Sequence, residues 1–580
     1  MEAKDFSLTE LLHRETQFYI PIFQRNYAWD SKNCKKLFDD IISIAKDTNR
    51  PCHFIGSIIY LSTNPFSSSI KECAVIDGQQ RLTTISLLLL ALADYSKEYY
   101  KTKDEYEDSE TCEEKLKNKY LVNQYAKANL YSKLMLTGID NKVYLHLLKE
   151  TLEEKAKSRS MPDGISYSAI HKNYLELLNL MKKGRYTPDF ILSGIQKLKI
   201  VDIPLSKEDN PQLVFETVNS TGKSLTEAQK IKNYILMTVP PEEQDDLYND
   251  YWLPMEKSLS CFFDSFFSYY VSLKIRNRVG KEYYNTFKEF MQSSKMNTSE
   301  AVKEISRFSK HFLRVKKNNG TKQIDIIISN ILLTDQLLIT PVLMQILDDV
   351  ETKKCSMSDA IKVLEIIEAY WIRRALCNFP SNTAGTVCFI MLKNLGKDDY
   401  VKGFREAIHN LTPAQRIPDD AELTRKLKDT PLYGKKICRM ILDRIEAHEN
   451  KDYTHSSNHT IEHIMPQTVK PSAEIPDDKK EKYDWASDLG ENWEQIHKIY
   501  IDTIGNLTLT GFNSEYQNYR FIVKRDMEDG YKQTPIRISK SLGDLSKWGE
   551  EEIVSRSAQL AQIIAQIWKY PKKPGPKPLF

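Results

Sequence analysis

The sequence has few features that would assign it to a specialised class of protein. None of the nine cysteines forms a CxxC pair, which excludes a zinc ribbon and a thioredoxin-like redox motif. Their odd number and scattered positions indicate reduced thiols, so we expect a cytoplasmic protein. The first residues carry no apolar signal core, and the longest apolar stretch, 85–93, is too short to cross a bilayer, so no membrane partner is expected.

An excess of charge of one sign is also absent. The chain has 82 Lys and Arg residues against 79 Asp and Glu residues, which gives a net charge of +3 and excludes a histone-like polycation. A nucleic-acid-binding groove needs only a local basic patch, so this class of partner stays open. Hydrophobic residues at 41% and charged residues at 28% are typical of a globular protein, and a length of 580 residues suggests about four domains.

The order of apolar and charged segments divides the chain into three regions and a tail. The first region, 1–240, mixes strands with helices. The second, 241–450, shows apolar residues at helical spacing and is expected to be an all-helical spacer. We expect a third unit at 451–570 and a flexible basic tail at 571–580. We therefore expect an α+β multidomain protein. The expected strands are 17–23, 54–62, 73–76 and 198–204, and the expected helices are 82–95, 212–236 and about 549–569.

The strongest chemical signal lies near the C-terminus, in IEHIMPQ at 461–467, IGNLTL at 504–509 and FNSEYQNYRFIVK at 512–524. A strand, a hairpin and a helix in this order are the layout of a ββα-metal nuclease site. Phosphodiester cleavage needs a base to activate water and a divalent ion to stabilise negative charge. His463 suits the base because an imidazole with a pKa of about 6.5 is neutral at cellular pH. Glu462 offers a hard oxygen ligand for Mg²⁺ or a similar ion, and Asn506 is expected to orient the imidazole or the loop.

The second metal ligand has two candidates. If 513–524 is one helix, Asn513 and Lys524 lie on nearly the same face, because 11 residues at about 100° each bring the chain round to almost the same direction. Asn518 then lies about 140° away. We favour Asn513 as the metal ligand and Lys524 as a phosphate contact, with Asn518 as the alternative. Each residue alone also fits a surface pair, a turn or a helix cap, and only the ordered set favours a nuclease.

This segment resembles the HNH (His-Me finger) nuclease domain of GmrSD-type, modification-dependent restriction endonucleases. Such domains carry an EH or DH pair followed by a proline, a GNLTL hairpin and a helix with two asparagines, a phenylalanine and a lysine. One departure is Glu462, where many HNH enzymes have aspartate. The matching residues are Glu462, His463, Pro466, Gly505, Asn506, Asn513, Asn518, Phe521 and Lys524.

A second signal is AVIDGQQRLTTISLLLLAL at 74–92, in which a strand runs into DGQQR and a helix begins at once. Gly78 tolerates a positive φ, and the start of the helix together with Arg81 offers N–H donors to a phosphate. Asp77 is placed to hold a metal ion or polarise water. Gln79 and Gln80 are placed to orient a nucleotide or that water.

Upstream, IPIFQRNYAW at 20–29 places Gln24 and Arg25 among aromatic residues. An arginine beside aromatic rings suits stacking and phosphate contact together. We therefore expect Phe23, Tyr27 and Trp29 to take part in sensing a DNA modification. The alternative is that Phe23 and Trp29 are core residues and Arg25 is a surface charge.

A third block, 214–236, contains Gly222-Lys223-Ser224 but is not a P-loop, because Thr217 stands where the pattern needs a glycine. Its residues Asn219, Gly222 and Lys232 are weaker candidates for lining a nucleotide pocket.

Together the three blocks resemble the N-terminal domain of the same GmrSD-type family, which has a ParB/sulfiredoxin-like fold. The resemblance implies nucleotide binding and hydrolysis coupled to the sensing of modified DNA. The family's residues carry over as Gln24, Arg25, Asp77, Gly78, Gln79, Gln80 and Arg81.

We therefore expect a nucleotide-stimulated endonuclease that uses Mg²⁺ or Mn²⁺ and an NTP to cleave modified double-stranded phage DNA. Glucosylated hydroxymethylcytosine, methylcytosine and phosphorothioate all fit as the modification. HNH sites usually cut one strand, so a double-strand break needs a homodimer or two nicks. The alternatives are an NTP-dependent DNA-binding regulator with an inactive nuclease site, and an RNA nuclease.

Overall fold

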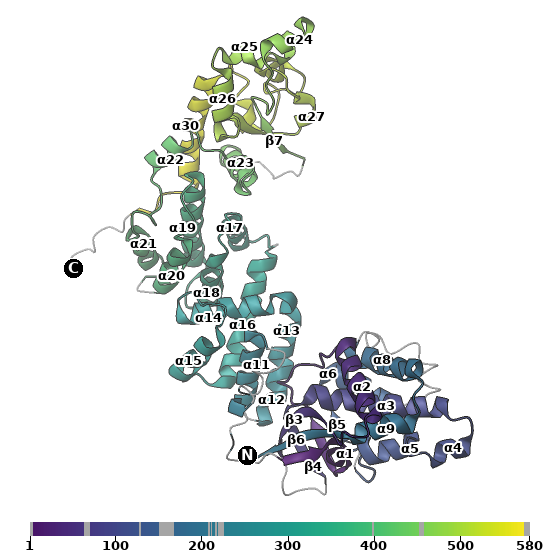
Figure 1. Ribbon diagram of the computed structural model, residues 1–580. Coiled ribbons are helices and arrows are strands. Elements are labelled where there is room, and N and C mark those ends of the chain that lie inside the picture. Colours follow the sequence, from purple (N-terminus) through teal and green to yellow (C-terminus); the bar gives the residue numbers. More distant parts are fainter. Residues whose placement is uncertain are drawn as a thin grey trace, which may run out of the picture. The chain divides into compact units, whose positions relative to one another are not determined.

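Figure 1 shows the computed structural model of the chain. It describes residues 4–62, 70–126, 129–149, 168–206, 209, 212–214, 217, 225–239, 241–318, 320–396, 399–451 and 458–572. Contacts divide the chain into two compact units, Met1–Leu253 with Met296–Val302 and Pro254–Lys295 with Lys303–Phe580. The finer boundaries expected at 240, 450 and 570 stay predictions. Asn219, Gly222 and most of the C-terminal tail lie outside the described residues.

The first unit is built on a six-stranded mixed sheet with the order β1-β6-β3-β4-β2-β5. β3 pairs antiparallel with β4 and parallel with β6, and β4 pairs parallel with β2. Three of the four expected strands are confirmed. The fourth, expected at 17–23, ends at Tyr19, because Pro21 cannot donate to a strand ladder and its carbonyl instead accepts Gln24 N in a turn. The strands are β1 Lys4–Ser7, β2 Thr16–Tyr19, β3 His53–Ser62, β4 Lys71–Asp77, β5 Leu134–Met135 and β6 Leu198–Leu205.

The helix α3, Gln79–Tyr99, runs through the core of this unit. Every residue from Leu82 to Ser96 is buried, which agrees with the expectation of a helix that is apolar on most faces. It packs against α8, while α2 packs against α8 and α9. Of the helix expected at 212–236, the described part is α11. The other helices of the unit are α1 Leu8–His13, α2 Ser31–Lys46, α4 Lys103–Asp108, α5 Glu113–Leu116, α6 Gly138–Lys149, α8 Ala169–Gly184, α9 Pro188–Gln196, α11 Glu227–Thr238 and α12 Pro241–Leu247.

The middle of the chain is helical, as expected. The described residues between 254 and 451 form no strand beyond a single bridge at Pro431. The aromatic run of α14 supplies core, since Phe266, Phe267 and Tyr270 are fully buried. The helices are α13 Leu253–Leu259, α14 Phe263–Ile275, α15 Tyr284–Ser294, α16 Thr298–Lys317, α17 Gln323–Leu332, α18 Thr340–Glu351, α19 Met357–Leu376, α20 Ala384–Asn394, α21 Tyr400–His409, α22 Asp420–Lys426 and α23 Ile437–Glu449.

The C-terminal part carries a two-stranded antiparallel sheet, β7 Thr460–His463 with β8 Leu507–Thr510, among short helices. The apolar side chains of β8 belong to one core cluster with those of α19, α23 and α30, so the hairpin rests on the helices around it. The long final helix, α30, confirms the expected one. The helices are α24 Asp477–Tyr483, α25 Trp485–Leu489, α26 Trp493–Tyr500, α27 Asn513–Tyr516, α28 Phe521–Asp526, α29 Arg537–Lys540 and α30 Glu550–Ile567.

The assumption of one helix over 513–524 is wrong. α27 ends at Tyr516, Gln517 takes a φ of 45°, and α28 begins only at Phe521. The backbone between them bonds to other elements, because Arg520 N donates to Lys482 O at 2.7 Å and Tyr519 O accepts Trp485 Nε1 at 3.0 Å. These tertiary hydrogen bonds replace the helical ones.

Candidate active site

The hairpin fixes the positions of Glu462 and His463. In its register Glu462 lies opposite Thr508 and His463 lies opposite Leu507. Neighbouring residues of a strand point to opposite faces, so the two side chains diverge. They consequently enter two different environments, although they are adjacent in the sequence.

Asn506 holds the loop that follows β7. Its side chain is fully buried and uses all four of its hydrogen-bonding positions. Oδ1 accepts Met465 N at 2.8 Å and Trp548 Nε1 at 3.2 Å, while Nδ2 donates to Met465 O and Ile501 O, both at 2.9 Å. Of the two roles expected for Asn506, its contacts match that of orienting the loop.

The last helix, α30, fixes the GNL turn before β8. No pattern in the sequence connects this helix with the GNLTL motif. The guanidinium of Arg556 is buried and donates to Gly505 O and Leu507 O, each at 2.8 Å. Burial lowers the pKa of Arg556 to about 10. Gly505 packs directly on α30, since an added Cβ would lie 2.3 Å from Ile553 O. The motif glycine is therefore required by close packing.

Glu462 turns into the interior and meets Lys524. The Nζ of Lys524 lies 2.5 Å from Glu462 Oε1, and it also donates to His463 O at 3.0 Å and to Ile464 O at 3.1 Å. The side chains are 0% and 5% exposed for Lys524 and Glu462 respectively, so all three donors of the ammonium are satisfied inside the protein. Burial raises the pKa of Glu462 and lowers the pKa of Lys524, and their mutual attraction opposes both shifts. In this arrangement Lys524 has no donor left for the phosphate contact expected of it.

The expected metal ligands do not assemble into an ion site. The Nδ2 of Asn513 donates to Ile461 O at 3.1 Å and to Thr460 Oγ1 at 3.2 Å. Asn518 is exposed in the turn after α27. Across the described parts of the chain, no group of three or more His, Cys, Asp or Glu side chains is placed to hold a metal. With the Glu462 carboxylate occupied by Lys524, these residues do not fit an ion as they stand, and the ligand set stays a prediction.

His463 faces a different set of partners. Its Nε2 lies 3.1 Å from Asp502 Oδ1, and its ring packs edge to face on Tyr433 with the centroids 4.3 Å apart. The imidazole is buried, whereas the Asp502 and Tyr433 side chains are well exposed, so the pair opens to solvent on their side. Burial lowers the pKa of His463, with further lowering from Lys524 and His497, against a raising contribution from Asp502. The lowered pKa favours a neutral imidazole at cellular pH.

Backbone pairing holds Asp502 and Tyr433 together. Asp502 O accepts Leu432 N at 2.7 Å and Tyr433 N at 3.1 Å, and a bridge joins Pro431 to Thr503 next to them. Neither side chain was predicted from the sequence. Asp502 stands four residues before Asn506 and offered a signal as an acidic residue beside the GNLTL motif. Tyr433 lies 30 residues before His463 and offered none.

In the first unit, the DGQQR motif joins β4 to α3. Gly78 has a φ of 95° and is the residue at which the strand turns into the helix. Arg81 Nη2 donates to Asp77 Oδ2 at 3.0 Å, and Nη1 donates to Ser57 O at 2.7 Å. Gly56 makes room for this guanidinium, since a Cβ there would lie 2.0 Å from Nη1. Arg81 therefore links β3 to β4, and much of its donor fork is already used.

The structure brings the two N-terminal motifs together. Gln80 Oε1 accepts Ala28 N at 2.8 Å and Trp29 N at 3.1 Å, and Gln24 Nε2 donates to Ile76 O at 2.8 Å. Arg25 is half-buried beside Asp77: burial lowers its pKa, and the Asp77 charge raises it. Gln79 is buried at the same helix start. Residues 24–29 and 77–81 thus form one cluster at the N-terminus of α3.

The three aromatic residues expected to sense a modification differ in exposure. Phe23 and Tyr27 are buried, at 7% and 8% exposure. The Tyr27 hydroxyl lies 2.7 Å from Thr84 Oγ1 and accepts Asn173 Nδ2 at 3.2 Å. Trp29 is half-buried, and its carbonyl accepts Asn173 Nδ2 at 2.7 Å. In the conformation described, Trp29 is the most exposed of the three, and their sensing role stays a prediction.

Two family models match the chain. The GmrSD restriction endonuclease N-terminal domain matches residues 8–236, and the GmrSD restriction endonuclease C-terminal domain matches residues 417–563. The chain belongs to the GmrSD restriction endonuclease family. None of the curated proteins compared with it matches.

The two matches cover the two clusters described above. The N-terminal match includes residues 24–29 and 77–81, and the C-terminal match includes Tyr433, the EH pair and Asp502. The chain is therefore a restriction endonuclease that binds DNA. Among the described residues, no helix is long and apolar enough to span a membrane. Residues 237–416 lie outside both matches.

Proposed function

We propose that this restriction endonuclease cleaves modified double-stranded DNA by a divalent-metal-dependent hydrolysis at His463, stimulated by an NTP at the N-terminal cluster. On this proposal the C-terminal domain is of the HNH type and the N-terminal domain is ParB/sulfiredoxin-like. The observation that carries it is the His463–Asp502 pair, a buried imidazole bonded to a solvent-facing carboxylate at the end of the EH strand.

The proposed chemistry uses His463 as a general base. A proton on Nε2 is held by Asp502, which leaves Nδ1 as the basic nitrogen. Nδ1 takes a proton from water as the water oxygen bonds to phosphorus, and the bond from phosphorus to the leaving oxygen breaks. A divalent ion would stabilise the charge on the phosphate and the leaving oxygen, and Glu462 and Asn513 would hold it once Lys524 released the Glu462 carboxylate. Asp502 acts as a positioning residue, because it selects the tautomer and fixes the ring.

The nucleotide is proposed to bind at the start of α3. The half-buried Arg25 beside Asp77 and the N–H groups of the helix start are the supporting features. Arg81 is assigned to holding β3 and β4 together, because its donors are engaged by Asp77 and Ser57. Hydrolysis of the NTP at this cluster is part of the proposal.

The test is a cleavage panel of phage and plasmid DNAs that are unmodified, methylated, glucosylated at hydroxymethylcytosine or phosphorothioated. Each is incubated with each NTP and with Mg²⁺, Mn²⁺ or EDTA. We expect cutting of one modified class, loss of cutting in EDTA, and faster cutting with an NTP. NTP hydrolysis without cutting of any DNA would support the regulator instead, and cutting of RNA alone would support the RNA nuclease. Sedimentation of the active protein tests the homodimer.

A further inference from the structure

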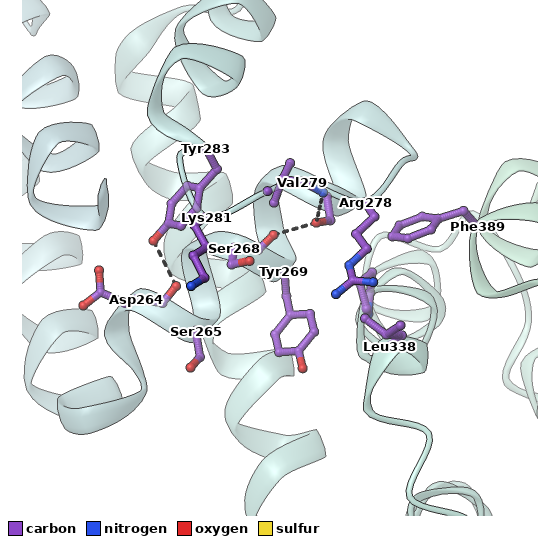
Figure 2. A pocket seen from close by; sticks show the side chains of 13 residues that line it. Asp264, Ser265, Ser268, Tyr269, Arg278, Val279, Lys281, Tyr283, Leu338 and Phe389 are labelled. Carbon is purple, nitrogen blue, oxygen red and sulfur yellow. Dashed lines mark hydrogen bonds between the residues drawn. The ribbon is translucent and has the colours of Figure 1, made fainter. Parts of the chain in front are cut away.

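The central helical region contains a cavity of about 720 Å³ that neither proposed site uses. It is bounded by α14, by the loop 276–283, and by α18 and α20 with the turn before α18 (Figure 2). Its position falls outside both family matches. A volume of this size is typical of pockets that hold small ligands.

One wall of the cavity is a row of hydroxyl groups on α14. Ser265, Ser268, Tyr269 and Ser272 all line it, and they are spaced three and four residues apart, which places them on one helical face. The opposite face of α14 is the buried aromatic core described above. The polar face of this helix therefore lines the cavity. Leu338, Pro341 and Phe389 supply an apolar wall.

The second wall is the loop 276–283, which hydrogen bonds anchor at both ends. Arg276 and Asn277 close the helix with backbone bonds to Leu273 O and Ser272 O at 3.2 and 3.1 Å. Val279 N donates to Ser272 Oγ at 3.3 Å, and Tyr283 Oη donates to Asp264 O at 3.0 Å. The loop is thus held in place against α14.

This loop presents two cations to the cavity, Arg278 and Lys281. Figure 2 shows Arg278 on the Phe389 side of the cavity and Lys281 on the Asp264 side. Within the described parts of the chain neither cation makes an ion pair, and the one acidic group of the lining, Asp264, is exposed.

Neighbouring basic residues, by contrast, are engaged. Lys274 pairs with Glu304 at 2.8 Å, Arg307 pairs with Asp348 at 2.5 Å, and Arg276 donates to Lys393 O at 3.4 Å. These three cations therefore have partners, whereas Arg278 and Lys281 are exposed at the cavity and make no ion pair with the described residues.

We propose that this cavity binds a nucleotide, with its phosphate at Arg278 and Lys281 and its ring against Tyr269 and Phe389. Two cations and the hydroxyl groups of Ser265 and Ser268 suit phosphate oxygens, whereas Ser272 Oγ already donates to Ser268 O at 2.8 Å. Aromatic and proline surfaces suit the face of a base. The same chemistry belongs to a free NTP and to a nucleotide within single-stranded DNA. The inference goes beyond the nuclease and N-terminal sites and does not depend on either.

The test is photo-crosslinking on the full-length chain carrying His463→Ala, so that no probe is cut. One arm uses 8-azido-ATP and the other uses a single-stranded oligonucleotide containing 4-thiothymidine, and labelled peptides are mapped by mass spectrometry. We expect one of the probes to label peptides from 263–283 or around Phe389. Labelling there falls at least about tenfold in the double variant Arg278→Gln/Lys281→Gln, which removes charge-assisted hydrogen bonds. Ser265→Phe, which fills the cavity without changing its charge, lowers labelling likewise.

The matched control is Lys353→Gln/Lys354→Gln, which removes the same charge beyond the far end of α18, about 18 Å along the helix from its start. It leaves labelling unchanged. Labelling by the ATP analogue alone identifies a free nucleotide as the ligand, and labelling by the oligonucleotide alone identifies DNA. No labelling of these peptides, or equal labelling of the double variant and the wild-type residues, would overturn the proposal. Peptides from 24–29 and 77–81 report separately on the N-terminal site.

Discussion

Two basic motif residues, one in each family-matched domain, were both expected to contact phosphate. Arg81 follows DGQQ at the start of α3 and keeps 21% of its side chain exposed while bridging Asp77 and Ser57 O. Lys524 is 0% exposed and is enclosed by Glu462 and two carbonyls. The first is part of an open cluster with Arg25 beside it, and the second is a sealed internal ion pair. A basic residue in a short motif therefore indicates that a positive charge is required at that position. Only the packing around it decides whether the charge contacts a ligand or another part of the protein.

The largest expected effect is a loss of stability on replacing Lys524, which distinguishes it from Arg81. Lys524→Met leaves the Glu462 carboxylate buried without a partner and should lower the free energy of unfolding by about 3–5 kcal/mol. Burial already raises the pKa of Glu462, and loss of Lys524 removes the contribution that lowers it. A folded-state pKa above the unfolded one means stability that is present at low pH and lost as pH rises, so the variant should gain stability on acidification. Urea unfolding at several pH values measures this.

The control for that prediction is the double variant Glu462→Gln/Lys524→Met, which removes both charges and should recover most of the lost stability. A Lys524→Met protein as stable as the wild type would contradict the sealed ion pair.

Arg81→Met should lower the free energy of unfolding by a smaller amount, about 1–2 kcal/mol. Its partners Asp77 and Ser57 O are partly exposed and can be rehydrated when the guanidinium is removed. The change is measured by the same urea unfolding, with the exposed Lys35→Met as the control. A loss of stability as large as that of Lys524→Met would show that Arg81 is also part of a sealed ion pair.

Asp502→Asn should slow DNA cleavage by about 10- to 100-fold with little change in stability, because it disturbs the tautomer and orientation of His463. Asp502 raises the pKa of His463, so its removal should also move the acidic limb of the rate profile to lower pH. Single-turnover cleavage measured across pH tests both effects, with the exposed Asp544→Asn as a matched control. An unchanged profile would show that Asp502 does not act on His463.

The smallest effect is expected at Tyr433. Replacing it by Ala removes an edge-to-face contact of about 0.5–1.5 kcal/mol and should slow cleavage by about 2- to 10-fold. Tyr433→Phe keeps the ring and should cleave at close to the wild-type rate. Equal losses in the two variants would assign the effect to the hydroxyl.

Much of the fold was predictable because burial leaves a periodic pattern in the sequence. The buried helix α3, the strands β3, β4 and β6 and the final helix α30 follow from such patterns. The break between α27 and α28 does not, since it depends on hydrogen bonds from Lys482 and Trp485, which lie more than 30 residues away. The comparison of helical faces for Asn513 and Lys524 assumed an unbroken helix and therefore failed.

The sequence motifs identify the candidate residues of the site. They do not identify the side chains that these residues contact. Glu462 and His463 are adjacent in the sequence, but strand geometry sends one side chain inward and the other toward Asp502. Tyr433 and Arg556 reach the site only through folding of distant segments.

We propose His463 as the base of DNA cleavage. Its most direct test is the single-turnover rate of cleavage of a modified DNA by His463→Ala and by the wild type, with thermal unfolding as a check on the fold. We predict a loss of about 10²- to 10⁴-fold at unchanged stability. Cleavage by His463→Ala at the wild-type rate would contradict it.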